Sequence, residues 1–129
     1  MATLTPTLTL VSTDTLSDSL NLSATDSLSI LGQSKRFTHV CSATKANLLL
    51  AADYTKSYVY LKNNDSAIVI HIGMDTEADD SIDNDATDLF IELAAGEFAF
   101  FPWSSTYNLH VDAASGTPTL EVMIFQAAA

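Results

Sequence analysis

The sequence predicts an all-β protein: a single jelly-roll-like β-sandwich preceded by an extended N-terminal arm. Short apolar segments with period-two alternation follow one another from residue 36 onward, and turn-forming residues separate them. No segment after residue 36 combines helical spacing with helix caps. At 129 residues, 47% of them hydrophobic, the chain can bury one core and has the length of a single domain.

Residues 1–35 form the predicted arm, which is rich in Ser, Thr, Leu and Asp. Threonine alternates along TLTPTLTL and favours extended backbone, because β-branched side chains fit a pleated strand and lose rotamer freedom in a helix. Small side chains give the arm little core of its own, so we expect Leu4, Leu8 and Leu10 to pack on the body or on a neighbouring subunit. A flexible, partly disordered tail is the alternative.

Residues 36–129 form the predicted sandwich. Its eight candidate strands are FTHVCSAT (37–44), ANLLLA (46–51), SYVYLKN (57–63), AIVIHIG (67–73), DLFIEL (88–93), EFAFFPW (97–103), YNLHVDA (107–113) and TLEVMIFQ (119–126). Turn-forming residues separate several of them, as in NNDS, AAGE and ASGTP. In the last strand, Leu120, Val122 and Ile124 share one face. Eight strands in a chain of this size favour a jelly roll.

The charge of the chain excludes several classes of partner. Five Lys plus Arg against sixteen Asp plus Glu give a formal net charge of -11 at pH 7. Nucleic acid is therefore not an expected partner, because its binding depends on basic side chains that neutralise phosphates. No run approaches the roughly 20 apolar residues of a membrane span, and the N-terminus lacks a signal-peptide pattern, so we expect a soluble protein without a membrane partner.

Carboxylates are concentrated between Gly73 and Glu92, with no Lys or Arg among them. They are Asp75, Glu77, Asp79, Asp80, Asp83, Asp85, Asp88 and Glu92. Such a run repels itself, and we interpret it as a solvated loop that limits aggregation. Calcium is the alternative ligand, although a loop opened at Asp83 would place Asp88 where an EF-hand needs glycine and Ala94 where it needs glutamate. We expect no metal site and no cofactor.

The residues that could carry catalysis form no known motif. His39, His71 and His110 lie in three different predicted strands, and Cys41 would share a face with His39, as a thiol–imidazole pair would. Cys41 is the single cysteine, which leaves no disulfide within the chain and no Cys/His zinc pattern. No glycine-rich nucleophile turn, P-loop, GxGxxG or HExxH sequence occurs. We therefore expect a protein that is not an enzyme.

The segment EFAFFPW has large apolar side chains on both faces, since Phe98 and Phe100 alternate with Ala99 and Phe101. A strand of this kind is either central in a sandwich or covered by another chain. We predict that Phe101 and Trp103 belong to a subunit interface, where aromatic side chains are enriched. An ordinary core strand is the alternative.

Three segments, SYVYLKNNDSAIVIHIG, IELAAGEFAFFPW and LHVDAASGTPTLEVMIFQ, resemble small all-β structural proteins of tailed bacteriophages, of the head-decoration or cement type. The pattern consists of a YVYLKN strand, an apolar strand after a polar turn, a GE turn before an aromatic strand that ends in proline, and a final hairpin. It covers residues 57–126. The resemblance implies a virion subunit, and a terminal arm that extends over a neighbouring capsid or tail subunit suits this family.

A second resemblance is to the cupins, which are jelly rolls that often hold a metal with His and Glu ligands. Gly96 and Pro102 match the opening of the second cupin motif. Tyr107 stands where that motif has histidine, and His71 lacks the second histidine of an HxH pair. This likeness therefore implies at most a similar fold without the metal site.

We expect a non-catalytic structural protein of a phage virion, made in the host cytoplasm and located on the capsid exterior, where it decorates and stabilises the shell. The expected partners are the major capsid protein or other virion subunits, together with further copies of the chain in a homo-oligomer. The alternatives are a tail, neck or fibre accessory protein, or a carbohydrate or host-surface binding module built on Trp103, Tyr107 and the acidic loop.

Overall fold

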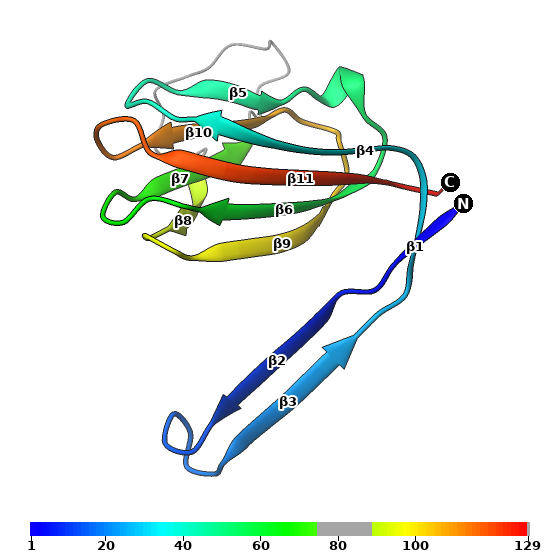
Figure 1. Cartoon of the computed structure of the whole chain (residues 1–129), viewed down its shortest axis with the longest axis vertical. Helices are drawn as coiled ribbons and strands as arrows, with labels where there is room; N and C mark the ends of the chain where they lie inside the picture. The colour runs from blue at the N-terminus through cyan, green and yellow to red at the C-terminus, as the bar shows by residue number, and fades with distance from the viewer. Residues whose placement is uncertain (75–88, 129) are drawn as a thin grey trace.

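The computed structural model describes residues 1–74 and 89–128, and their regular structure consists of strands and one short 3-10 turn, η1 (Ala51–Asp53) (Figure 1). The strands are β1 (Ala2–Leu4), β2 (Thr7–Ser12), β3 (Leu20–Thr25), β4 (Leu28–Val40), β5 (Ala46–Leu49), β6 (Ser57–Asn63), β7 (Ile70–Met74), β8 (Leu89–Leu93), β9 (Phe98–Trp103), β10 (Leu109–Ala113) and β11 (Thr119–Ala127). The all-β prediction is confirmed.

Two antiparallel sheets make up the body of the molecule. One has the strand order β1-β4-β11-β6-β9, and the other has the order β5-β10-β7-β8. The eight strands from β4 to β11 correspond to the eight candidate segments, and residue-by-residue pairing of β11 with both β4 and β6 makes β11 central in its sheet. Chain neighbours after β4 alternate between the sheets in most cases, so the order of strands within each sheet differs from their order in the chain (Figure 1).

The core lies between the inner faces of these two sheets. Alternate residues of β6 and β11 point inward, which buries Val59 and Leu61 on one strand and the predicted row of Leu120, Val122 and Ile124 on the other. Ile70, Ile72, Leu109 and Val111 of the second sheet belong to the same cluster of buried side chains. Apolar burial of this kind supplies about 1.5 to 3 kcal/mol for each large aliphatic side chain, and it holds the two sheets together.

A buried amide joins the two sheets at one end. Asn63, in the last position of β6, donates its side-chain N–H groups to the carbonyl oxygens of Leu93 at 2.9 Å and Ile68 at 2.8 Å, and its oxygen accepts from the backbone N–H of Asp65 at 3.0 Å. A buried polar side chain is tolerated when its hydrogen bonds are made, and three are made here. Asn63 therefore fixes the turn after β6 against β8.

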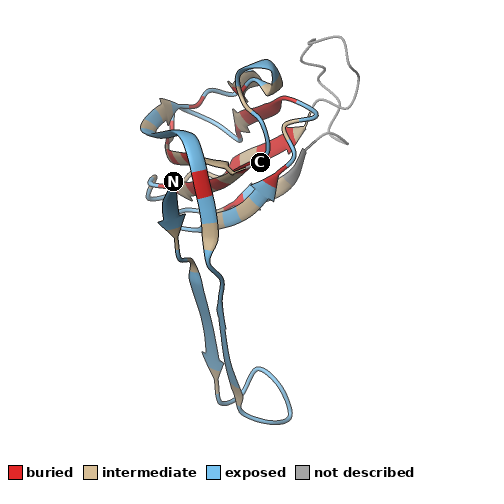
Figure 2. Ribbon diagram, turned by 90° about the vertical axis from the view of Figure 1, so that its right-hand side faces the viewer, coloured by how far each residue is buried: buried red, intermediate tan, exposed pale blue. Residues whose placement is uncertain are grey.

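The N-terminal arm consists of a short strand and a projecting hairpin. β1 pairs with the first residues of β4, from Leu28 to Ile30, and extends the five-stranded sheet by one strand. β2 and β3 pair only with each other in a separate two-stranded sheet that points away from the body (Figure 1). Figure 2 shows the hairpin as almost continuously exposed, whereas buried residues gather in the body.

Two sequence predictions concern the acidic loop and the boundary between arm and body. The acidic loop, including Asp75, Glu77, Asp79, Asp80, Asp83, Asp85 and Asp88, lies outside the described residues, as does the calcium alternative. β4 runs from residue 28 to residue 40 and therefore crosses the expected boundary at residue 35. Within residues 1–74 and 89–128, no helix has the length and apolar character needed to traverse a lipid bilayer.

Candidate interaction surface

The hairpin has one apolar face and one polar face. On one face, Leu8 pairs with Ala24 and Leu10 with Leu22. The pairs on the other face are Thr7 with Thr25, Thr9 with Ser23 and Val11 with Asn21. We call the side chains of Leu8, Leu10, Leu20, Leu22 and Ala24 the leucine face. Leu10 is 44% exposed and Leu22 is 45% exposed. An isolated two-stranded hairpin is only marginally stable in water, so this face needs a cover.

Gly32 in β4 lies beside an irregularity in the sheet, close to the part of β4 that pairs with the arm. This residue has a φ of +95°, which glycine adopts without steric cost. A Cβ at this position would lie 2.5 Å from the side-chain oxygen of Gln126, and that oxygen accepts the backbone N–H of Gln33 at 3.2 Å. Here the pairing of β11 with β4 is irregular between Phe125 and Ala127. A bulge bends the strand that contains it, so we expect the irregularity and the positive φ of Gly32 to influence the direction in which the arm leaves the sheet.

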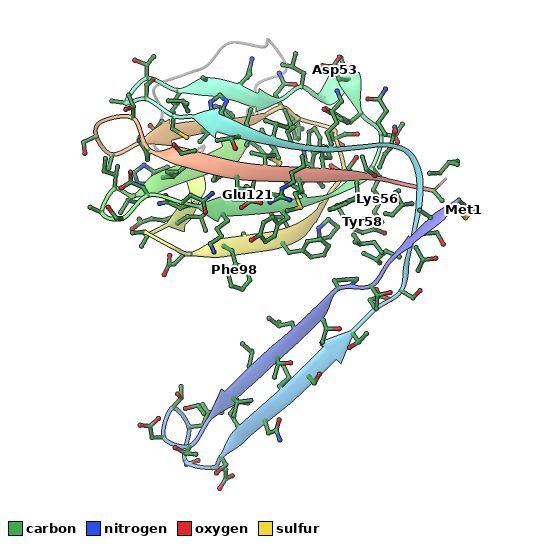
Figure 3. The ribbon with its side chains drawn as sticks, in the orientation of Figure 1. Met1, Asp53, Lys56, Tyr58, Phe98 and Glu121 are labelled. Atoms are coloured by element: carbon green, nitrogen blue, oxygen red, sulfur yellow. The ribbon has the colours of Figure 1, made fainter. Side chains whose placement is uncertain are left out.

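Aromatic side chains cover part of the outer face of the five-stranded sheet. Tyr58 and Tyr60 of β6 stack on Phe100 and Phe98 of β9, each with 6.4 Å between ring centroids. We call these four residues the aromatic row. β9 is an edge strand, and Phe98 is 60% exposed. In Figure 3, Tyr58 and Phe98 lie on the side of the body from which the hairpin projects.

A groove separates the base of the hairpin from the aromatic row. Its volume is about 590 Å³, and Leu8, Ala24 and Leu28 line it from the arm while all four residues of the aromatic row line it from the sheet. A neighbouring hollow of about 260 Å³ is lined by Leu4, Pro6, Tyr60, Phe100, Met123 and Phe125. The two hollows make one continuous apolar surface, because Pro6, Tyr60 and Phe100 line both. Surfaces of this kind mark contacts with other apolar groups.

The interface residues expected from the sequence fall in different places. Leu4 and Leu8 line the two hollows, and Leu10 is exposed farther along the hairpin. Trp103 is 2% exposed and belongs to the core, where its Nε1–H donates to the carbonyl oxygen of Tyr107 at 3.1 Å. Phe101 is partly buried against the same core.

The outward-facing aromatic residues of β9 are therefore Phe98 and Phe100, and they replace Phe101 and Trp103 as the part of the body that a partner can reach. The period-two alternation in EFAFFPW separates these two pairs correctly. It does not say which pair points inward, because both pairs are aromatic.

Two of the three histidines lie on the outer face of the four-stranded sheet. His71 Nδ1 is 2.9 Å from Asp112 Oδ1, and its Nε2 is 4.0 Å from Glu92 Oε2. His110 is fully buried, and within residues 1–74 and 89–128 neither of its ring nitrogens has a hydrogen-bond partner. His39 lies on β4 in the other sheet, where burial lowers its pKa from the ordinary value of 6.5. The fold does not bring the three imidazoles together in one site.

The only cysteine is not poised for nucleophilic chemistry. Cys41 is 1% exposed, and burial, followed by the negative charge of Asp112, raises the pKa of its thiol to about 11. A thiol with this pKa remains protonated at neutral pH and is a poor nucleophile. Among residues 1–74 and 89–128, no three or more His, Cys, Asp or Glu side chains are grouped as metal ligands.

Comparisons with known proteins give one similarity in fold. No family model matches the chain, and no curated protein matches it. Among solved structures, the chain is similar to a protein of the Bacillus endospore appendages, which form a novel family of disulfide-linked pili. The TM-score is 0.54 at 14% sequence identity, and the match covers 78% of this chain and 91% of the pilus chain. At this identity the similarity concerns the fold alone.

Proposed function

We propose that this chain is a non-catalytic structural subunit of a phage virion, which decorates and stabilises the capsid exterior by docking its hairpin on a neighbouring subunit. The observation that carries the proposal is the projecting hairpin, whose leucine face is exposed although the body has a well-packed core. A surface of aliphatic side chains that the subunit does not cover itself is typical of a contact made in an assembly.

Docking on an assembled particle stabilises that particle by mass action. A subunit that binds the assembled shell and not its dissociated parts adds the free energy of binding to the assembled state. Each contact can be modest, since many equivalent copies act together. The hairpin also has two free strand edges, which can pair with an exposed sheet edge of the neighbour through main-chain hydrogen bonds.

We also infer that the body is a jelly roll. Apart from β1, the two sheets have the orders β4-β11-β6-β9 and β5-β10-β7-β8, so the first body strand lies beside the last and the second beside the second to last. This nesting of outer around inner strand pairs is what a jelly roll requires. It supports the expected fold, and a jelly-roll body with a terminal arm suits a shell or fibre subunit equally well.

The second candidate function is a subunit of a fibre, and the similarity in fold to a pilus protein favours it. The linkage between subunits would differ from that of the disulfide-linked pili. This chain has one cysteine, and Cys41 is buried with a raised thiol pKa, so a disulfide between copies would require the body to open. A fibre of this chain would therefore depend on non-covalent contacts.

The test removes the hairpin and keeps the body. The backbone N–H of Asp26 donates to the carbonyl oxygen of Pro6 at 3.2 Å, so a two-glycine linker can replace residues 7–25 while β1 stays paired with β4. We expect this variant to unfold at the same temperature as the full chain but to stay unbound when mixed with particles that lack the protein. The matched control is Val11→Ser, which changes the polar face of the hairpin and leaves docking intact.

Decoration of particles by the excised variant at full occupancy would contradict the proposal. Counting copies on purified particles then separates the two functions. A capsid decoration protein is present on the order of hundreds of copies per icosahedral shell, whereas a tail, neck or fibre accessory follows the lower symmetry of its own structure.

A further inference from the structure

We propose that the groove beside the aromatic row is the docking site for the hairpin of a second copy of this chain. This inference rests on the proposed function and adds the identity of the hairpin's partner and the position of the acceptor surface. It concerns the continuous apolar surface formed by the two hollows on the outer face of the five-stranded sheet.

The leucine face and the aromatic row suit one another because each is an apolar surface on one side of a pair of strands. The leucine face is one strand pair wide, and its outer part, with Leu10 and Leu22, lies beyond the groove of its own subunit. The aromatic row also extends over two paired strands, β6 and β9. A hairpin from a second copy can lay leucine side chains on this row, with its threonine-rich face toward solvent or toward the first hairpin. This one contact would remove both the leucine face and the aromatic row from water, which favours association.

The charges of the two surfaces are complementary, and this selects the hairpin as the occupant. Residues 1–31 contain Asp14, Asp18 and Asp26 and neither Lys nor Arg. All five basic residues of the chain fall between residues 35 and 62. Two of them lie next to the aromatic row. Lys62 is on the same outward-facing side of β6 as Tyr58, and the Nζ of Lys56 lies 5.8 Å from the centre of the Tyr58 ring.

The carboxylate on the same sheet face is already paired. Glu121 Oε1 accepts from the Arg36 guanidinium at 2.8 Å, so among the described residues Lys56 and Lys62 are the unneutralised basic side chains of the sheet beside the aromatic row, whereas Asp26 lines the groove from the arm. An acidic hairpin is attracted to this face, whereas a basic or neutral segment gains less. Although the body as a whole is acidic, the two lysines beside the aromatic row favour an acidic partner such as the hairpin.

Crosslinking between two different variants tests this contact directly. One protein carries Leu10→Cys on the leucine face, the other carries Phe98→Cys on the aromatic row, and both residues are exposed at the surface. Each also keeps Cys41, which is buried and stays unreactive. After mixing and mild oxidation, we expect a mixed disulfide dimer, which cannot form within one chain.

The control replaces Leu10→Cys with Val11→Cys, which lies next to it on the polar face and is 68% exposed. We expect the control to give about tenfold less mixed dimer, because only a docked thiol has a high effective concentration near its partner. Equal yields from the two mixtures would overturn the inference, and so would the absence of any mixed dimer.

A second measurement separates this inference from the proposed function. Light scattering of the full chain should show association that Leu10→Asp or Phe98→Asp abolishes, with unfolding temperatures unchanged. A full chain that remains monomeric while removal of the hairpin still prevents particle binding would overturn self-docking and leave the structural function in place. Association of copies together with full decoration by the hairpin-less variant would instead support self-docking and overturn the proposed function.

Discussion

Strands β2 and β6 have the same period-two pattern of side chains, yet they differ completely in burial. In β6 every second residue is buried, from Ser57 to Asn63, because β11 and β9 flank it and the second sheet covers its inner face. In β2 no residue is buried, because among the described strands it pairs with β3 alone. Alternation therefore defines the two faces of a strand, whereas coverage of a face depends on partners from elsewhere in the chain or from another chain.

The difference in coverage should appear as a large difference in stability. Leu61→Ala removes a fully buried side chain of the core, and we expect it to lower the free energy of unfolding by about 3 kcal/mol. The same change at Leu10, on the exposed leucine face, should alter it by less than about 0.5 kcal/mol in the monomer. Urea unfolding of dilute protein measures both. Equal losses would mean that the hairpin is covered in the free subunit.

The junction between arm and body should respond to a change at Gly32. Gly32→Ala forces a Cβ into a left-handed conformation and against the side chain of Gln126, and we expect it to lower stability by about 1 to 2 kcal/mol. Gly96 is the matched control, since it also has a positive φ, of +80°, but no atom of the described residues lies within 4 Å of an added Cβ.

Thermal unfolding of the two alanine variants separates backbone strain from the collision. In a Gln126→Ala background, Gly32→Ala should lower stability only as much as Gly96→Ala does in the unaltered chain, because the collision is gone and the proteins with and without Gly32→Ala both lack the Gln126 hydrogen bonds. Small-angle scattering should also show a changed arm direction in the Gly32 variant alone. An unchanged scattering profile would show that the bulge in β4 directs the arm without help from this glycine.

A smaller effect is expected from pH, and it concerns the body alone. Burial lowers the pKa of His39 below the ordinary value of 6.5, so the unfolded chain binds a proton there more readily than the folded chain. Stability contributed by this residue is therefore highest above pH 6.5 and declines as the pH falls through 6.5 toward the lower folded pKa. His39→Gln should flatten this part of the curve of unfolding free energy against pH.

A second group acts at lower pH and serves as the control for His39. Hydrogen bonds from the backbone N–H groups of Ala67 and Ile68 lower the pKa of the Asp65 carboxyl below its ordinary value of 3.8. Its contribution is present above pH 3.8 and declines as the pH falls below that value. A loss of stability between neutral pH and pH 5 that persists in His39→Gln would assign the effect to another group.

Much of the fold was predictable from local patterns in the sequence. The alternation in SYVYLKN and TLEVMIFQ identifies both strands, and the row of Leu120, Val122 and Ile124 that it places on one face is fully buried. The candidate surface was predictable only in part. Leu4 and Leu8, which the sequence singled out, line it, but Phe98 and Phe100 had to be distinguished from Phe101 and Trp103 by the structure.

The sequence by itself determined the strand character of the chain, the two faces of each strand and the acidic charge of the arm, because all three follow from residue types at fixed local spacing. Only the tertiary structure decided that the arm is a hairpin, that β9 lies at a sheet edge and that its outer aromatic side chains border a groove. These features depend on pairings between residues far apart in the chain, and local alternation is compatible with many such pairings.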